Sequence, residues 1–264
     1  MNTTIPSFNV TASGVLSSRL TLTVIVMLII GEALAPLLLS KHITVYSLYH
    51  LMQTLLLVAL AFVIKKEMQQ SHALHASLSR QDWARVASLL AGGIIFSFAG
   101  DLINSGLFVL ADLLQPQTLL SIPPFALAHV CYIAAFYLLS RRWLRASSNL
   151  FLSITIAAAP VLAISVWSFV MPSDMPRFVA YATLMYAFII ATMVLAAIWV
   201  ARAWRRPALP VMLGAFLFLV SDALLGYALL RERPFVVGQI IWATYILGQL
   251  LIVRAGLLFR AAPA

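Results

Sequence analysis

The 264-residue chain is 63% hydrophobic and only 9% charged, whereas average proteins carry about 25% charged residues, so its composition excludes a soluble globular domain. The net charge of +9 could indicate a nucleic-acid partner, but the arginines lie at the ends of apolar runs and therefore predict membrane topology instead. A single cysteine, Cys131, excludes a disulfide framework and a cysteine metal cluster.

Long apolar blocks separated by short basic stretches predict an all-α integral membrane protein, a single bundle of eight transmembrane helices over residues 1–264. We expect the spans at residues 20–40, 43–64, 86–114, 118–140, 149–171, 178–200, 208–230 and 235–257. A polar segment of 19 residues precedes the first span and carries no secretory signal. Residues 65–85 form a polar connection, and the other connections are short, so sequential helices are expected to be antiparallel neighbours.

Two aspartates, Asp101 in the third span and Asp222 in the seventh, lie within apolar runs that are long enough to cross a bilayer. An acidic residue at the centre of a helix costs about 2.5–3.5 kcal/mol on insertion scales, so it usually faces a polar interior and marks function. At 1.5 Å per residue from the start of each span, both aspartates lie about 21–23 Å deep. We therefore predict that this pair forms the centre of the functional site.

Further polar residues fall in the same predicted layer, several of them spaced three or four residues apart on one helix face. The candidates for supporting or substrate-binding roles are Asn104, His129, Tyr132, Ser221, Tyr245, Gln249, Glu32 and His50. A wet pocket that faces the bundle interior would satisfy these groups together, although any one of them alone could be a structural hydrogen-bond partner. Asp112, about three turns beyond Asp101, is expected near the outer surface.

A zinc site is the main chemical alternative for such a set of residues. The His-rich motif His72-Ala-Leu-His75 lies in the polar connection, and no span carries a His-x-x-x-His pair. The sequence also lacks a phosphate-binding loop, a nucleophile elbow and a dinucleotide fingerprint. We therefore expect neither a metal nor a cofactor.

Four short motifs follow one another over roughly residues 90–258. They are Gly100-Asp101, Ala128-His129-x-x-Tyr132 with Phe136 after it, Gly214-Ala215-x-x-Phe218-x-x-Ser221-Asp222, and Tyr245-x-x-x-Gln249-x-Leu-Ile-Val-Arg254. In order and spacing they resemble the YhhN-like lysoplasmalogenase family of multi-span membrane hydrolases. The chain differs in its second span, where a Lys-Pro pair is common in the family and Tyr49-His50-Leu51-Met52-Gln53 stands here.

The resemblance implies hydrolysis of the vinyl ether of lysoplasmalogens with an ethanolamine or choline headgroup, which gives a fatty aldehyde and a glycerophospho-alcohol. Its implied partners are the lysophospholipid substrate and the lipid bilayer, and no nucleic acid. The reaction starts with protonation of a vinyl carbon, which generates an oxocarbenium ion that water attacks. Asp101 and Asp222 suit this chemistry as one acid and one carboxylate, in either assignment, because burial and a second nearby carboxyl favour keeping one carboxyl protonated.

Two other functions use similar residues. A proton-coupled transporter also places acids near the middle of the membrane, although pairs of broken helices rich in Gly and Pro are missing from corresponding positions. A non-catalytic lipid-binding protein is the second alternative. Release of aldehyde by the purified protein distinguishes the enzyme from both.

Basic residues predict the orientation of the bundle. Thirteen of the 17 Lys and Arg residues lie on the side that holds both termini, and four lie on the opposite side. By the positive-inside rule, both termini should be cytoplasmic in a multi-pass protein of the bacterial inner membrane. A reporter enzyme fused after Ala264 should be active only if it folds in the cytoplasm. Activity of a periplasmic reporter at the same position would contradict the span assignment.

Overall fold

The computed structural model describes residues 12–41, 43–71, 77–105, 117–231 and 238–260. Within these residues, eight helices are long and apolar enough to cross a membrane and no strand is present, which confirms the predicted fold class. The helices are α1 (Ala12–Lys41), α2 (Ile43–Gln70), α3 (Arg80–Asn104), α4 (Ile122–Ala146), α5 (Asn149–Val170), α6 (Arg177–Trp204), α7 (Leu209–Leu230) and α8 (Gly238–Val253). Short 3-10 helices precede α4 (η1, Gln117–Ser121) and α7 (η2, Arg206–Ala208), and another follows α8 (η4, Arg254–Arg260).

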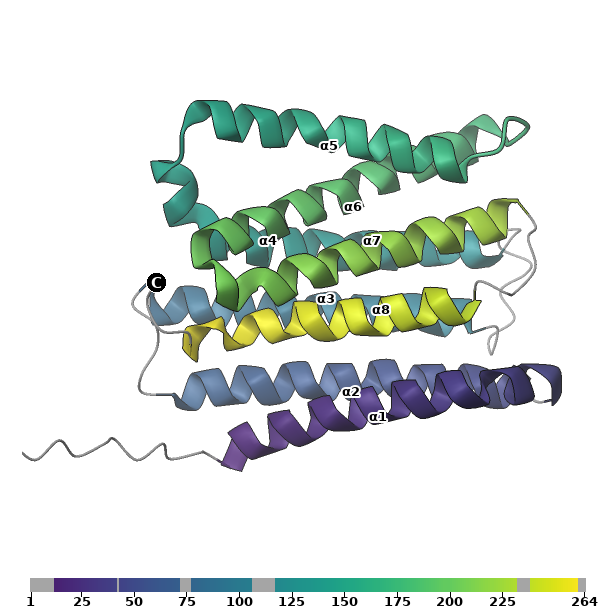
Figure 1. The fold of residues 1–264 in the computed structure, drawn as a ribbon, viewed down its shortest axis with the longest axis horizontal. Helices are drawn as coiled ribbons and strands as arrows, with labels where there is room; N and C mark the ends of the chain where they lie inside the picture. Colours follow the sequence, from purple (N-terminus) through teal and green to yellow (C-terminus); the bar gives the residue numbers. More distant parts are fainter. Residues whose placement is uncertain (1–11, 42, 72–76, 106–116, 232–237, 261–264) are drawn as a thin grey trace, which may run out of the picture.

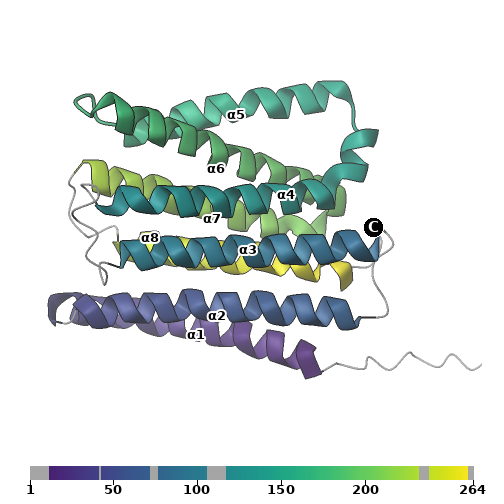
Figure 2. The same ribbon diagram turned by 180° about the vertical axis from the view of Figure 1, so that it is seen from behind.

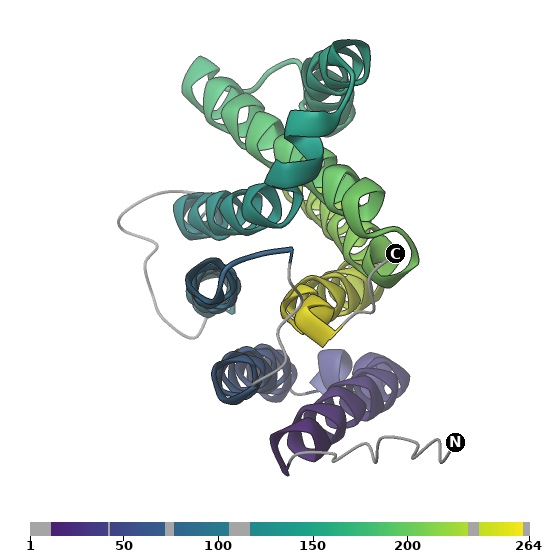
Figure 3. The ribbon, with the colours of Figure 1, turned by 90° about the vertical axis from the view of Figure 1, so that its left-hand side faces the viewer.

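Seven of the described helices form a closed ring, and α5 lies outside it. Contacts run from α1 through α2, α3, α4, α6, α7 and α8 back to α1, whereas α5 packs on the outer side of α6 and α7. The end-on view shows α2, α3 and α4 in one column, with α1, α8 and α7 opposite them (Figure 3). Sequential helices are antiparallel, so the start of α1 and the end of α8 lie at the same end of the bundle (Figures 1 and 2). The expectation that sequential helices are neighbours holds except for α4, which packs against α6 instead of α5.

The helices α2 and α3 extend further into the polar stretch 65–85 than the predicted spans do. The hydroxyl of Ser79 accepts a hydrogen bond of 3.1 Å from the backbone N–H of Asp82 and so caps the start of α3. Because α3 begins at Arg80, Asp101 lies about 31 Å along its helix, whereas Asp222 lies about 20 Å along α7. The equal depth obtained by counting residues therefore depends on the assumed starts of the spans.

Glycines allow the closest approaches between helices. A Cβ atom at Gly93 would lie 2.2 Å from the ring of Tyr132, so α3 and α4 touch through this glycine. A Cβ atom at Gly214 of α7 would lie 2.8 Å from the carbonyl oxygen of Gly248 on α8. Small residues at such contacts are typical of membrane helices, in which van der Waals packing replaces the hydrophobic effect. Large apolar side chains are exposed on the outer surface of the bundle, particularly along α1 and α5, where lipid would contact them.

Substituting Gly214→Ala should destabilise the contact between α7 and α8. The new Cβ atom would meet two rigid neighbours, the Leu251 Cβ atom at 2.7 Å and a backbone oxygen at 2.8 Å. Overpacking of this kind costs about 1–3 kcal/mol, so the unfolding midpoint in detergent should fall. The matched control is Gly92→Ala, where the nearest atom, the Cys131 sulfur, is 3.7 Å away. This control should keep or raise the midpoint, and equal midpoints for both variants would contradict the close contact.

Candidate active site

Asp222, on α7, forms a cluster with side chains of α4 and α6. Its Oδ2 atom accepts a hydrogen bond from the hydroxyl of Tyr186 on α6. The Nε2 atom of His129, on α4, lies 3.4 Å from the same Oδ2 atom and 3.0 Å from the Tyr186 oxygen. The other ring nitrogen of His129 lies 3.3 Å from the sulfur of Met193, and Phe218 packs edge-on against the ring. The fold thus brings together two predicted site residues, Asp222 and His129.

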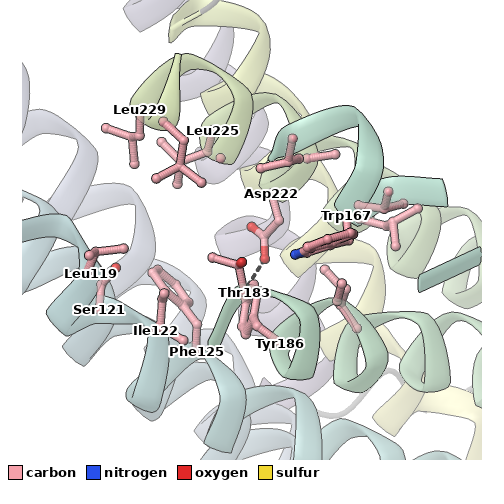
Figure 4. Close-up of a pocket in the computed structure, with 18 residues that line it drawn as sticks. Leu119, Ser121, Ile122, Phe125, Trp167, Thr183, Tyr186, Asp222, Leu225 and Leu229 are labelled. Atoms are coloured by element: carbon pink, nitrogen blue, oxygen red, sulfur yellow. Dashed lines mark hydrogen bonds between the residues drawn. The ribbon is translucent and has the colours of Figure 1, made fainter. Parts of the chain in front are cut away.

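A largely apolar cavity opens beside Asp222, between α4, α5, α6 and α7 (Figure 4). It contains about 800 Å³ of empty space including its mouth, and most of its lining comes from Leu, Ile, Val, Phe and Ala side chains. Asp222, from α7, and Tyr186, from α6, point toward each other where they line the cavity (Figure 4). The hydroxyl of Thr183 and the indole N–H of Trp167 also border the cavity, but both donate hydrogen bonds to backbone oxygens of α6. Asp222 is the one charged residue among the described residues that line the cavity.

Asp101, near the end of α3, belongs to a second cluster. Its Oδ2 atom accepts hydrogen bonds from the hydroxyls of Thr54 on α2, at 2.7 Å, and Tyr245 on α8, at 2.8 Å. Its side chain is buried, with 6% exposure, and it is not among the residues that line the cavity. The rings of Phe125 and Phe218 pack edge-on against Tyr245. These aromatic contacts lie between the Asp101 cluster and the cavity.

The sequence predicts one wet pocket shared by all the polar groups, but the structure divides these groups among separate clusters. Asp222 borders the cavity, whereas Asp101 lies behind aromatic side chains. Gly100 explains part of the difference, because the Phe125 ring occupies space only 2.6 Å from where a Cβ atom at this position would be. The ring therefore fills the volume beside Asp101 that a water-filled pocket would need. The two carboxyl groups still interact electrostatically.

Tyr132 and Gln249 form a third cluster, which lies deeper between α3, α4 and α8. The hydroxyl of Tyr132 donates a hydrogen bond of 2.6 Å to the Oε1 atom of Gln249, whose amide nitrogen donates one of 2.7 Å to the hydroxyl of Ser97. All three side chains are fully buried, and none of them lines the cavity. Their hydrogen bonds connect α3, α4 and α8 to one another.

The remaining predicted residues lie elsewhere. Ser221 donates a hydrogen bond of 2.9 Å to a backbone oxygen of α8, and the Oδ1 atom of Asn104 is buried without a hydrogen-bond partner. Glu32 on α1 and His50 on α2 lie on the side of the bundle opposite the cavity, and Asp112 is outside the described residues. In the part of the chain that the structure describes, no three His, Cys, Asp or Glu residues converge to hold a metal ion. The predicted absence of a metal stays a prediction.

Comparison with protein families places these clusters in a known context. The family model described as the YhhN family matches residues 46–256, which include all but the first three residues of α2, the helices α3 to α8 and both aspartate clusters. The chain belongs to the YhhN family. This family is associated with lysoplasmalogenase activity. No curated protein and no solved structure matched the chain.

Sequence analysis missed two residues that hold the aspartates of this YhhN-family protein, Tyr186 and Thr54. Tyr186 is one of two tyrosines near the start of α6, and nothing in the sequence distinguishes it from Tyr181, which is exposed on the outer surface. Thr54 had a detectable signal, because it lies four residues after His50 and so shares a helix face with a predicted site residue. Threonine is nonetheless common within apolar helices, so its presence alone does not indicate a functional site.

Substituting Tyr132→Phe should destabilise the protein without enlarging the cavity. The variant removes the hydroxyl that donates to Gln249 and leaves a buried oxygen without this donor, which costs about 1–3 kcal/mol. Thermal unfolding followed by circular dichroism in detergent should show a lower midpoint. The control is Tyr137→Phe on the same helix, because the Tyr137 side chain is exposed, and it should leave the midpoint unchanged. An unchanged midpoint for Tyr132→Phe would remove the structural role proposed for this cluster.

Proposed function

We propose that this YhhN-family protein hydrolyses the vinyl ether bond of lysoplasmalogens within a bacterial inner membrane. The observation that supports this proposal best is the position of Asp222, a hydrogen-bonded carboxyl group at the wall of an otherwise apolar cavity. The apolar lining suits the hydrocarbon chain of a lysolipid. The carboxyl group suits protonation of the vinyl double bond at the start of the lipid's hydrocarbon chain.

In the proposed reaction, Asp222 transfers its proton to the vinyl carbon that is not bonded to oxygen. The C=C electron pair forms the new C–H bond, and positive charge develops on the carbon bonded to oxygen. Water adds to this carbon and loses a proton to the Asp222 carboxylate. The resulting hemiacetal breaks its bond to the glycerol oxygen, and the proton of its O–H group passes to that oxygen, which gives a fatty aldehyde and a free hydroxyl group on the glycerophospho-alcohol.

Tyr186 and His129 would hold Asp222 for these steps. Both of their contacts are made with the Oδ2 atom, so the Oδ1 atom is the oxygen available to carry the transferred proton. The Tyr186 hydroxyl would stabilise the carboxylate that forms when the proton leaves, because hydrogen bonds to a charged oxygen are stronger than those to a neutral one. The Nε2 atom of His129 lies 3.4 Å from the same oxygen and would help to orient the carboxyl group.

Asp101 would act on Asp222 from outside the cavity. Two carboxyl groups in a medium of low dielectric constant disfavour simultaneous ionisation, so we assign the proton to Asp222, which borders the cavity, and the carboxylate to Asp101. The hydroxyls of Thr54 and Tyr245, which both donate to the Oδ2 atom of Asp101, would hold this carboxyl group in place. The negative charge of Asp101 would also favour the oxocarbenium ion.

Substituting Asp222→Asn or Asp101→Asn should abolish aldehyde release from lysoplasmenylethanolamine by the purified protein. General acid catalysis is typically worth 10²–10⁴-fold, and each loss should be at least that large. Because the two carboxyls act together, the double variant should be little worse than either single one. Tyr186→Phe should retain the acid and lose about tenfold, as expected for one hydrogen bond to a charged group.

The matched control is Asp174→Asn, because Asp174 is exposed in the connection between α5 and α6 and should not affect turnover. Circular dichroism should show that all variants are folded. A saturated ether lysolipid should not be cleaved, since it has no vinyl carbon to protonate. Near-normal turnover in folded Asp222→Asn would overturn the mechanism. No aldehyde from the wild-type protein would favour a non-catalytic lipid-binding role instead.

A further inference from the structure

A group of polar and aromatic side chains lies between α1, α2 and α8, on the side of the ring opposite the cavity. Tyr46, His50 and Gln53 recur every three or four residues along one face of α2. The His50 ring stacks on Trp242 of α8, with centroids 3.9 Å apart, and Tyr46 packs edge-on against His50 at the same distance. Glu32 approaches from α1 and interacts electrostatically with Tyr46. We refer to these five residues as the α1–α2–α8 cluster.

Close packing places α1 next to this cluster. The Tyr49 ring lies where a Cβ atom at Gly31 would be, and its hydroxyl donates a hydrogen bond to the backbone oxygen of Met27. From α8, the amide of Gln239 donates a hydrogen bond of 3.4 Å to the backbone oxygen of Glu32. These contacts fix the backbone around Glu32 but use no atom of its carboxyl group.

Three polar atoms of the cluster are buried without a hydrogen-bond partner: Glu32 Oε2, Tyr46 Oη and Gln53 Nε2. The side chains of Tyr46 and Gln53 are 6% and 0% exposed, so water does not satisfy these two atoms from bulk solvent. Within the described residues, no Lys, Arg or His forms a salt bridge with Glu32. Unpaired buried polar groups are costly, and acidic side chains within membrane helices usually have a partner.

We propose that the α1–α2–α8 cluster binds the ammonium group of an ethanolamine-type lysophospholipid headgroup. An ammonium group supplies N–H donors for the two unpaired oxygens and a positive charge for Glu32. The Gln53 Nε2 atom is a donor, which suits an oxygen of the adjoining phosphate. Both halves of the headgroup thus match unpaired atoms in the cluster.

Two connections link the α1–α2–α8 cluster to Asp101. Gln53 is followed directly by Thr54, which donates to Asp101, and Trp242 packs 5.1 Å from Tyr245, which also donates to Asp101. A headgroup bound here would therefore lie beside the residues that carry the two hydrogen-bond donors of Asp101. The inference rests on the proposed function only in taking the ligand to be a lysolipid.

Binding can be measured without turnover by using saturated ether lysolipids of equal chain length with ethanolamine or glycerol headgroups. The full-length protein in dodecyl maltoside should bind the ethanolamine lipid at least tenfold more tightly by native mass spectrometry. Glu32→Gln should remove this preference and leave the affinity for the glycerol lipid unchanged. The control is Glu67→Gln, because Glu67 is also buried but lies near the opposite end of α2, and it should keep the preference.

Equal affinities of the wild-type protein for the two lipids, or an unchanged preference in Glu32→Gln, would overturn the inference. If Glu32→Gln does not fold, Tyr46→Phe decides, with a loss of at least threefold in preference expected and no loss contradicting the site. Soluble phosphoethanolamine that binds as tightly as the lysolipid would overturn the lipid assignment. Preference for ethanolamine without aldehyde release from a vinyl ether lipid would support this inference and reject the proposed function, and aldehyde release without preference would do the reverse.

Discussion

A bilayer offers no water to a buried carboxyl group, so acidic side chains inside this bundle depend on hydrogen bonds from other helices. Asp101 on α3 receives two such bonds, from α2 and α8. Asp222 on α7 receives one from α6 and lies beside an imidazole of α4. Six of the eight described helices therefore meet at two carboxyl groups. A rotation of any of these helices by one residue, about 100°, would remove a partner, so satisfying the acids also fixes the packing.

The same side-chain type occupies two different environments here, and the difference gives each aspartate its own capability. Asp222 borders an apolar cavity, where a hydrocarbon chain can lie against its free oxygen. Asp101 is enclosed by hydroxyl donors and aromatic rings and does not line the cavity. Paired carboxyls with separate surroundings are a general way to hold one acid and one base at a single pH. The aromatic side chains between the two clusters maintain this difference by excluding water.

The sequence predicts the eight helices well, because long apolar runs and basic flanks are properties of single segments. It also draws attention to Asp101, Asp222 and His129 as candidate site residues, since polar groups in such runs are rare. The partners Thr54 and Tyr186 were not predicted, because their role depends on which face of α2 or α6 meets another helix. The same limitation explains why the sequence led us to expect a single wet pocket. Whether a phenylalanine such as Phe125 fills the space between two polar groups depends on contacts between helices and not on spacing within one.

A lysolipid with its headgroup in the α1–α2–α8 cluster and its chain in the cavity would have to pass between the two aspartates. The rings of Phe218 and Tyr245 meet there, with centroids 5.2 Å apart, and Tyr245 is also hydrogen-bonded to Asp101. The vinyl ether of a lysoplasmalogen lies between its headgroup and its hydrocarbon chain. In this position the vinyl ether would lie at the contact between Phe218 and Tyr245, where an aspartate could transfer a proton to it. Binding of substrate would therefore separate these rings and expose Asp101 to the reacting carbon. The aromatic contact beside Asp101 is thus the contact that substrate would have to replace.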